Sequence, residues 1–251
     1  MIICKSPGEI EKLRNSGRLV RQVLEETRRR VRAGVTTLDL ERFVERRLRQ
    51  LGAASAFKGY RGYPCCLCAS VNEQIVHGIP SGRRVLREGD IVSLDLGVIL
   101  NGYYGDSALT VPVGEIGEPL KKLLRVTEES LELAIQKVRA GNRLGDISAT
   151  VQQHAERNGF SVVREFVGHG IGREMHEEPQ IPNFGQPGHG PLLKPGMVLA
   201  IEPMLNERGD AVRLLADHWT AVTADGGYSA HFEHMVAVTG DGPDVLTRLE
   251  S

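Results

Sequence analysis

Residues 89–111 read Gly-Asp-Ile-Val-Ser-Leu-Asp-Leu-Gly-Val-Ile-Leu-Asn-Gly-Tyr-Tyr-Gly-Asp-Ser-Ala-Leu-Thr-Val and carry the strongest structural signal in the chain. Along the first arm, apolar side chains take every second position, which is the period of a β-strand. The pair Asn101-Gly102 follows, and it is typical of a two-residue hairpin turn because both positions need a positive φ. We therefore predict two antiparallel strands joined at this pair.

The turn fixes which residues of the two predicted strands face each other. Gly97 pairs with Asp106 and Asp95 pairs with Ala108, so the aspartates are diagonal neighbours with backbones about 7–8 Å apart. Two adjacent carboxylates repel each other unless a cation lies between them. The alternative is a pair of surface aspartates on a solvated sheet face. The small residues around them, Ser93 included, favour a metal site in a hollow.

The composition bounds the class of protein. The chain has 251 residues, of which 41% are hydrophobic, and this is enough for a sizeable core. Lys and Arg total 31 against 32 Asp and Glu, which predicts no strong attraction to DNA or to a membrane surface. No apolar run reaches transmembrane length, and the first residues lack the layout of a signal peptide. We therefore expect a cytoplasmic protein.

Two local features have alternative interpretations. Arginines cluster at residues 28–32 and 42–49, and such runs are typical of solvated helix faces, with contact to ribosomal RNA as the alternative. Cys65, Cys66 and Cys68 are too close together for a disulfide framework, which agrees with a reducing compartment. They also lack the paired spacing of a zinc site, so a zinc site is the weaker interpretation.

The sequence repeats itself with a constant offset of 107 residues. Apolar residues at helical spacing predict a helix that begins after residue 6 and ends at residues 31–34, Val-Arg-Ala-Gly, and residues 138–141 repeat those letters. A second predicted helix ends at Gly52, which Gly159 answers, and the strand 89–95 is answered by residues 196–202. We infer a duplication with halves at about 8–112 and 115–240. It predicts an α/β (α+β) fold in which helices cover one face of an antiparallel sheet about a pseudo-twofold axis.

The duplication also repeats the acidic side chains of the apolar strands. Glu202 stands where Asp95 stands in the first copy, and Glu233 lies near an apolar run as Asp106 does. His169 lies in Gly-His-Gly-Ile-Gly, residues 168–172, where glycines let a backbone pass close to a ligand. If the halves meet at these strands, the five groups converge, and two divalent cations would neutralise the four carboxylates. Carboxylate with imidazole suits Mn, Fe, Co or Zn, and a pair of such ions suits hydrolysis.

Taken in order, these motifs resemble those of methionine aminopeptidases. They are Asp-Leu-Gly from residue 95, Gly-Asp-Ser from 105, Gly-His-Gly-Ile-Gly from 168, Ile-Glu-Pro-Met from 201 and Phe-Glu-His from 232. The resemblance covers essentially the whole chain and implies the duplicated "pita-bread" fold in a single catalytic domain, residues 1–251. Glu202 lies only 33 positions after His169, which leaves no room for the helical insertion of type II enzymes. The chain therefore resembles the short bacterial type I form, without a zinc-finger extension.

The resemblance implies a role for each of the five groups. Asp95 would bind one metal ion and His169 the other, with Asp106 and Glu233 bridging the pair. Glu202 would bind metal and accept a proton from the bridging water or hydroxide that attacks the scissile carbonyl. The implied cofactor is two divalent ions, Co, Mn, Fe(II) or Zn, without a choice among them. The implied activity is removal of N-terminal methionine from nascent proteins and peptides when the second residue is small.

Further side chains enter through the same resemblance. His77 would contact the nitrogen of the scissile amide, and His176 would hydrogen-bond the carbonyl oxygen as negative charge develops there. Without the family pattern, either histidine is an ordinary loop residue. Rings and sulfur suit a thioether. The implied walls of the methionine pocket are Phe57, Tyr60, Tyr63, Cys68, His77, Met175 and Trp219.

Two of these positions depart from the family or lie outside its pattern. Met175 stands where many relatives carry Phe, which affects the expected pocket shape. His231 lies two residues before Glu233 and would share its face on a regular strand. We expect His231 to support the metal ligands without binding a metal itself.

Two other functions fit parts of the pattern. A proline-specific peptidase of the same fold, a prolidase or aminopeptidase P, carries an extra N-terminal domain for which this chain has no room. A non-catalytic binding homologue would be expected to lose metal ligands, and all five are present. The resemblance implies a monomer that acts on the N-termini of nascent polypeptides, and the net charge of −1 predicts no DNA or membrane partner.

Overall fold

The predicted hairpin is present with the predicted register. The computed structural model describes residues 1–249, and in it β4 (Ile91–Leu100) and β5 (Tyr103–Pro112) run antiparallel. Gly97 lies opposite Asp106, and both turn residues have positive φ, 51° and 77°. β2 (Leu67–Val71) and the short β1 (Ala54–Ser55) also pair with β4. The hairpin is therefore the centre of the first half.

The described residues form four α-helices, two in each half. They are α1 (Pro7–Arg28), α2 (Thr37–Gln50), α3 (Glu118–Ile135) and α4 (Leu144–Arg157). α4 begins and ends 107 residues after α2, and α3 ends 107 residues after α1. The offset found in the sequence is thus repeated by the helices of the structure, while the bounds of the two halves stay a prediction.

α1 and α3 each end three residues before the predicted boundary. In both halves the next residues form tight turns instead of a further helical turn, and Val31 N donates to Arg28 O as Val138 N donates to Ile135 O. Both valines still pack against the core, and Val138 is fully buried. The two valines fit the helical spacing of apolar residues although they are not helical. Periodicity alone therefore predicted the C-terminal end of each helix too late in the chain.

A matched glycine turn follows each of these segments. Gly34 and Gly141 have φ of 87° and 93°, a conformation that favours glycine. The N–H of Gly34 donates to Leu86 O at 2.9 Å, and that of Gly141 donates to Leu193 O at 3.1 Å. Each turn therefore ties the helical pair of its half to the strand region of the same half.

The second half is built around a five-stranded antiparallel sheet. Its order is β15 (Pro243–Val245), β14 (His234–Val238), β9 (Val198–Ile201), β7 (Gly168–Gly170) and β8 (Glu177–Ile181). The other strands form two smaller antiparallel sheets, β13-β10-β6 and β11-β12-β3. Their bounds are β3 (Gln74–Val76), β6 (Ser161–Val162), β10 (Met204–Asn206), β11 (Val212–Leu214), β12 (Ala221–Thr223) and β13 (Ser229–His231).

His231 and Glu233 do not lie on one regular strand, because the structure divides residues 229–238 at Phe232 and Glu233 into β13 and β14. β13 pairs with β10, whereas β14 pairs with β9. The partner strand is interrupted at Glu202 and Pro203, and proline has no N–H to continue a ladder. At the break, Phe232 N donates to Pro203 O and Glu233 N donates to Ala108 O. The two breaks lie side by side and free both glutamates from regular pairing.

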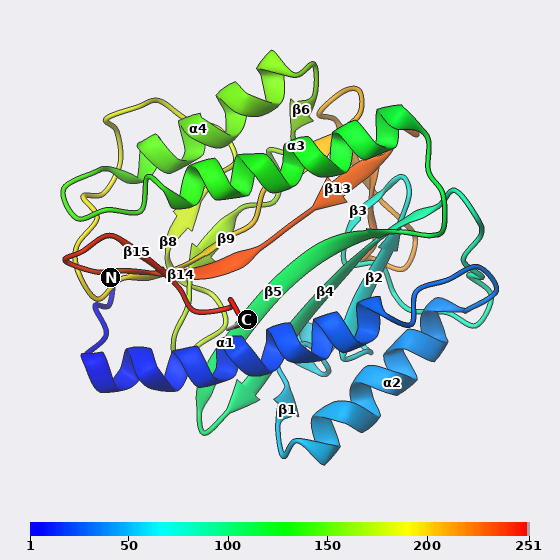
Figure 1. The fold of residues 1–251 in the computed structure, drawn as a ribbon, viewed down its shortest axis with the longest axis horizontal. Coiled ribbons are helices and arrows are strands. Elements are labelled where there is room, and N and C mark those ends of the chain that lie inside the picture. The colour runs from blue at the N-terminus through cyan, green and yellow to red at the C-terminus, as the bar shows by residue number, and fades with distance from the viewer. Residues whose placement is uncertain (250–251) are drawn as a thin grey trace.

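The helices lie together on the near side of the strands in Figure 1. α1 packs on β4 and β5, while α3 packs on α4 and contacts β9, β10 and β13. The main hydrophobic core draws on both halves, for example Val20 and Leu94 from one and Leu123 and Leu199 from the other. This arrangement confirms the mixed α/β fold with helices over antiparallel strands. The assignment of residues 1–251 to one domain stays a prediction.

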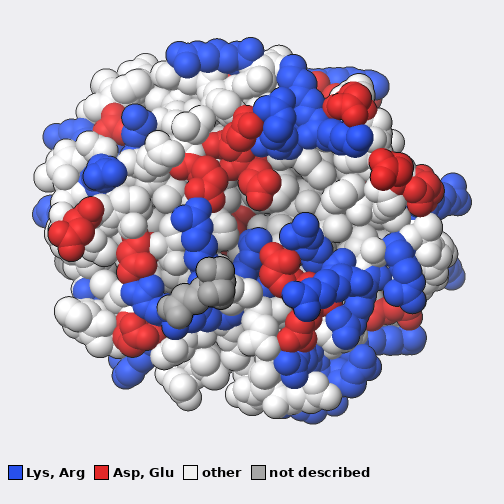
Figure 2. Space-filling model, in the orientation of Figure 1, with Lys and Arg blue, Asp and Glu red and all other residues white. Residues whose placement is uncertain are grey.

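Charges of both signs are mixed over the surface. Figure 2 shows Lys and Arg gathered at the lower right of the view, over the end of α1 and over α2, with acidic side chains among them. Arg28, Arg47 and Arg49 pair there with acids of the same two helices. Within residues 1–249, no helix has the length and apolar character needed to cross a membrane.

Candidate metal centre and active site

Five acidic and imidazole groups converge on one cavity of about 210 Å³. Asp95 projects from β4 and Asp106 from β5, while His169 comes from β7. Glu202 and Glu233 lie at the two strand breaks, next to Pro203 and Phe232 respectively. Both halves of the chain therefore contribute to the same site.

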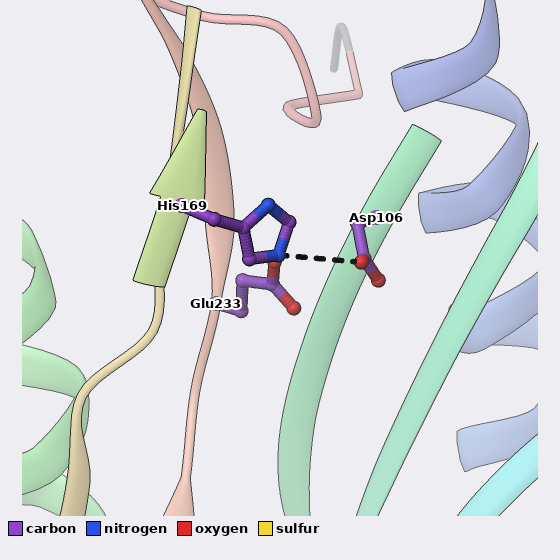
Figure 3. Close-up of side chains that lie close together, drawn as sticks. All are labelled: Asp106, His169 and Glu233. Atoms are coloured by element: carbon purple, nitrogen blue, oxygen red, sulfur yellow. Dashed lines mark ion pairs between the residues drawn. The ribbon is translucent and has the colours of Figure 1, made fainter. Parts of the chain in front are cut away.

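The tightest part of the cluster consists of Asp106, His169 and Glu233, which face one another in Figure 3. One potential ligand atom from each lies within 4.8 Å of the others. His169 Nε2 is 3.9 Å from Asp106 Oδ2 and 3.6 Å from Glu202 Oε1. His169 Nδ1 lies 2.9 Å from Gly170 O, and a carbonyl only accepts, so Nδ1 carries the proton. The lone pair of Nε2 therefore faces the acids.

The cluster is costly without a cation. Burial raises the pKa of Asp95 to about 7 and the pKa of Glu202 to about 8. Burial, reinforced by the neighbouring carboxylates, raises the pKa values of Asp106 and Glu233 well above their ordinary range. Asp95 Oδ1, Asp106 Oδ1 and Glu233 Oε1 are buried and have no hydrogen-bond partner within residues 1–249. Unpaired carboxylate oxygens beside an imidazole lone pair fit a divalent transition metal.

The other residues predicted for the site line the same cavity. These are Phe57, Tyr60, Tyr63, Cys68, His77, Met175, His176 and Trp219. The ring of Tyr63 packs edge-on against Trp219 at 5.1 Å, and the Tyr60 hydroxyl is 2.9 Å from His176 Nδ1. Burial lowers the pKa of His77 to about 4, so its ring is neutral near pH 7.

Four further residues line the cavity without having been singled out from the sequence. They are Arg61, Val76, Phe166 and Val167. The ring of Phe166 lies 5.3 Å from that of His77. Phe166 and Val167 stand directly before Gly-His-Gly, so their closeness to that motif was the available signal. An apolar pair beside a glycine is nevertheless indistinguishable from ordinary core in a single sequence.

The hollow predicted at the two aspartates is present, because Asp95 and Asp106 both line the cavity. The Phe57 ring fills the part of it over Gly97, where an added Cβ would lie 2.5 Å from that ring. The weaker interpretation, a zinc site at Cys65, Cys66 and Cys68, finds no support. Within residues 1–249, the close cluster of potential metal ligands is the one at Asp106.

A buried ion pair anchors the loop that carries Met175 and His176. Lys5 Nζ lies 2.6 Å from Glu177 Oε2, with side chains 5% and 7% exposed. Glu177 Oε1 accepts the N–H of Arg173 at 2.9 Å, so one carboxylate ties the loop both to itself and to the N-terminal segment. The loop is thereby fixed against the cavity.

We expect Lys5→Met to destabilise the protein by about 3–5 kcal/mol, because it leaves the Glu177 carboxylate buried without its charge partner. The free energy of unfolding from urea titrations measures the effect. Lys121→Met is the control, since it removes an exposed pair with Glu118 whose worth is about 1 kcal/mol or less. Equal stability of the two variants would contradict the role given to Lys5.

Comparison with known proteins places this fold and site in a family. A model described as metallopeptidase family M24 matches residues 11–240. Methionine aminopeptidase 1 of Bacillus subtilis is 53% identical over 249 residues, covering 99% of this chain and 100% of that protein. The crystal structure of methionine aminopeptidase from Thermotoga maritima has a TM-score of 0.98 at 49% identity and covers 99% and 100%. A prolidase from Pyrococcus furiosus, with TM-score 0.81 and 22% identity, shares the fold, and this chain covers 66% of it.

A duplicated α/β fold that buries carboxylates and an imidazole in one cavity defines a class of metal-dependent hydrolases. The chain belongs to metallopeptidase family M24, and its full-length similarity places it among the methionine aminopeptidases of the short bacterial form. The family resemblance, the pita-bread fold and the class of enzyme predicted from the sequence are confirmed.

Proposed function

We propose that this cavity removes the N-terminal methionine from nascent proteins and peptides whose second residue is small. One observation carries the proposal: the cluster of Asp106, His169 and Glu233 borders a cavity whose other walls are mostly rings and sulfur. A methionine side chain is apolar, flexible and polarizable, and it suits such walls. The small volume of the cavity supports a limit on the residue that follows methionine.

The proposed cofactor is a pair of divalent ions, Co, Mn, Fe(II) or Zn. Asp95, Asp106, His169, Glu202 and Glu233 would hold them, and the unpaired buried carboxylate oxygens support this assignment. Ions bound there would lower the pKa of a water molecule and polarise a carbonyl oxygen. Family membership supports the use of metal, whereas the number and identity of the ions are part of the proposal.

The side chains of the cavity have complementary tasks in this proposal. Glu202, whose Oε1 lies 3.6 Å from His169 Nε2, would accept the proton of the attacking water and return it. In this proposal the Tyr60 hydroxyl, 2.9 Å from His176 Nδ1, would donate to it, and the ring proton would then lie on Nε2. His176 can then donate to the carbonyl oxygen of the substrate. His77, neutral and beside Phe166, would contact the amide nitrogen.

Peptide hydrolysis tests the proposed substrate directly. We expect release of methionine from Met-Ala-Ser and negligible release from Met-Leu-Ser, because the leucine side chain does not fit beside the cluster. Ala-Pro-Ser should remain intact, measured by chromatography of the products with Mn²⁺ present. Cleavage of Ala-Pro-Ser with sparing of Met-Ala-Ser would favour a proline-specific peptidase, and cleavage of none would favour a binding protein.

The proposed partners are the N-termini of nascent chains. We place the protein in the cytoplasm as a monomer, with residues 1–251 as one catalytic domain. Contact with ribosomal RNA would use the arginines over α1 and α2 (Figure 2). Arg29 and Arg32 support this, since neither has an acidic partner within the described part of the chain. Such contact would be electrostatic and would weaken as salt rises.

A further inference from the structure

The imidazole of His231 lies beside the Glu202 carboxylate. His231 is 1% exposed, and it is outside the set of residues that line the cavity. Its Nε2 lies 3.5 Å from Glu202 Oε2, while Glu202 Oε1 lies 3.6 Å from His169 Nε2. The Glu202 carboxylate therefore lies between two imidazoles. Of the two, only the His169 ring has a role in the proposed reaction.

The ring of His231 has unused hydrogen-bonding capacity. Neither of its nitrogens has a hydrogen-bond partner among residues 1–249. Buried polar groups of native proteins are nearly always partnered, so an orphaned ring beside a carboxylate calls for an explanation. A neutral imidazole offers one N–H and one lone pair. Glu202 Oε2 is the acceptor that the structure places beside Nε2.

The backbone of His231 is fixed to the hairpin that carries Asp95. Thr110 Oγ1 accepts the N–H of His231 at 2.9 Å and donates to its carbonyl oxygen at 2.9 Å. Ser93, which faces Thr110 in the hairpin, supplies a third hydrogen bond at 2.9 Å between the two hydroxyls. The hydroxyl of Thr110 thus makes three hydrogen bonds, two of which hold His231 of β13.

The same residue is fixed to the strand that follows Glu202. His231 pairs with Met204 in the ladder of β13 and β10, and Met204 is two residues after Glu202. His231 is therefore held between the hairpin bearing Asp95 and the segment bearing Glu202. Its backbone is thus held on both sides, which keeps the buried ring in the segment beside the carboxylate.

We propose that His231 is a positioning residue for Glu202, to whose Oε2 its Nε2–H donates a hydrogen bond. The bond would restrain the carboxylate so that Oε1 stays directed at His169 and the acidic cluster. This inference rests on the proposed function, in which Glu202 is both a metal ligand and a proton acceptor. Residues that orient a metal ligand in this way typically change metal affinity by about 10–100-fold.

Two substitutions of the full-length protein separate hydrogen bonding from packing. His231→Leu keeps an apolar group of similar bulk and removes the donor, whereas His231→Gln places an amide N–H near the position of Nε2. We expect His231→Leu to weaken binding of Mn²⁺ by about 10–100-fold in anaerobic calorimetry and to lower kcat with little change in KM. His231→Gln should restore Mn²⁺ affinity close to that of the unaltered protein.

His234→Gln is the matched control, because His234 is also a buried histidine near Glu233. Its Nδ1 lies 2.7 Å from Thr247 Oγ1, so it already has a partner and should leave Mn²⁺ affinity unchanged. Binding by His231→Leu as tight as in the unaltered protein would overturn the proposal. Equal weakening of Mn²⁺ binding in His231→Leu and His231→Gln would also overturn the proposal, because a hydrogen-bond donor at this position would then make no difference.

A second measurement needs no variant, so it tests the proposal even if His231→Leu fails to fold. In ¹⁵N-histidine spectra of the unaltered protein, we expect His231 as the Nε2–H tautomer, and an Nδ1–H tautomer would overturn the inference. Failure of the proposed function is distinguishable from both results. A protein that binds Mn²⁺ but releases no methionine would overturn that function while the comparison of Mn²⁺ affinities still decides the role of His231.

Discussion

Replacement of His169 by alanine is expected to lower kcat/KM for Met-Ala-Ser by about 10³-fold. The Nε2 lone pair faces Asp106 and Glu202 because Nδ1 donates to Gly170 O, so the substitution removes a neutral ligand from the centre of the cluster. Metal ions contribute several kcal/mol to hydrolysis, and each factor of ten corresponds to about 1.4 kcal/mol. Initial rates of methionine release measure the loss, and treatment with a chelator should reproduce it.

His154→Ala is the control for this substitution. His154 lies on α4, where its Nε2 is 3.1 Å from Glu129 of α3 at the surface, and its loss should leave activity unchanged. Metal content determined alongside the rates shows whether His169→Ala acts by releasing metal. Full activity in the chelated protein would refute metal-dependent hydrolysis, and full activity in metal-loaded His169→Ala would refute the place given to His169.

The metal-free protein is expected to lose stability as pH rises. Burial raises the pKa of Asp95 to about 7 and that of Glu202 to about 8. Between the pKa of an unfolded acid and these values, both carboxyls are protonated in the folded state and ionised in the unfolded chain. The folded state then binds more protons, and stability falls by about 1.4 kcal/mol per pH unit for each such group. The fall begins above about pH 4, where unfolded acids ionise, and ends near pH 7 for Asp95 and near pH 8 for Glu202.

Urea unfolding of chelated protein between pH 5 and pH 9 measures this dependence. Bound cations favour the ionised carboxylates, so the same series with excess Mn²⁺ should show a much smaller fall. Asp95→Asn is a useful comparison, because it removes one of the titrating groups and should flatten the metal-free curve. A metal-free protein that is more stable at pH 9 than at pH 5 would show that the acids are not held protonated.

Sequence periodicity and turn chemistry were sufficient for the framework. The Asn101-Gly102 turn fixed the register of β4 and β5, and with it the diagonal placement of Asp95 and Asp106. The constant offset of 107 residues then located Glu202 as the counterpart of Asp95. These features are local or repetitive, so they leave a mark in a single sequence.

Other features depend on contacts between distant segments and could not be predicted. The break at Phe232 arises because β13 and β14 follow different partners across Pro203. The ring of Phe57 fills the space over Gly97, which no spacing rule connects to it. Lys5 meets Glu177 from the other end of the chain, and neither residue is unusual in its own segment.

The placement of the acids on both repeats has a consequence for the protein as a whole. Asp95 and Asp106 come from the first repeat, and His169, Glu202 and Glu233 come from the second, so opening of either repeat separates the proposed ligands. A cation retained there would report that the entire chain is assembled. Metal content of a purified sample would then serve as a gauge of how many molecules are intact.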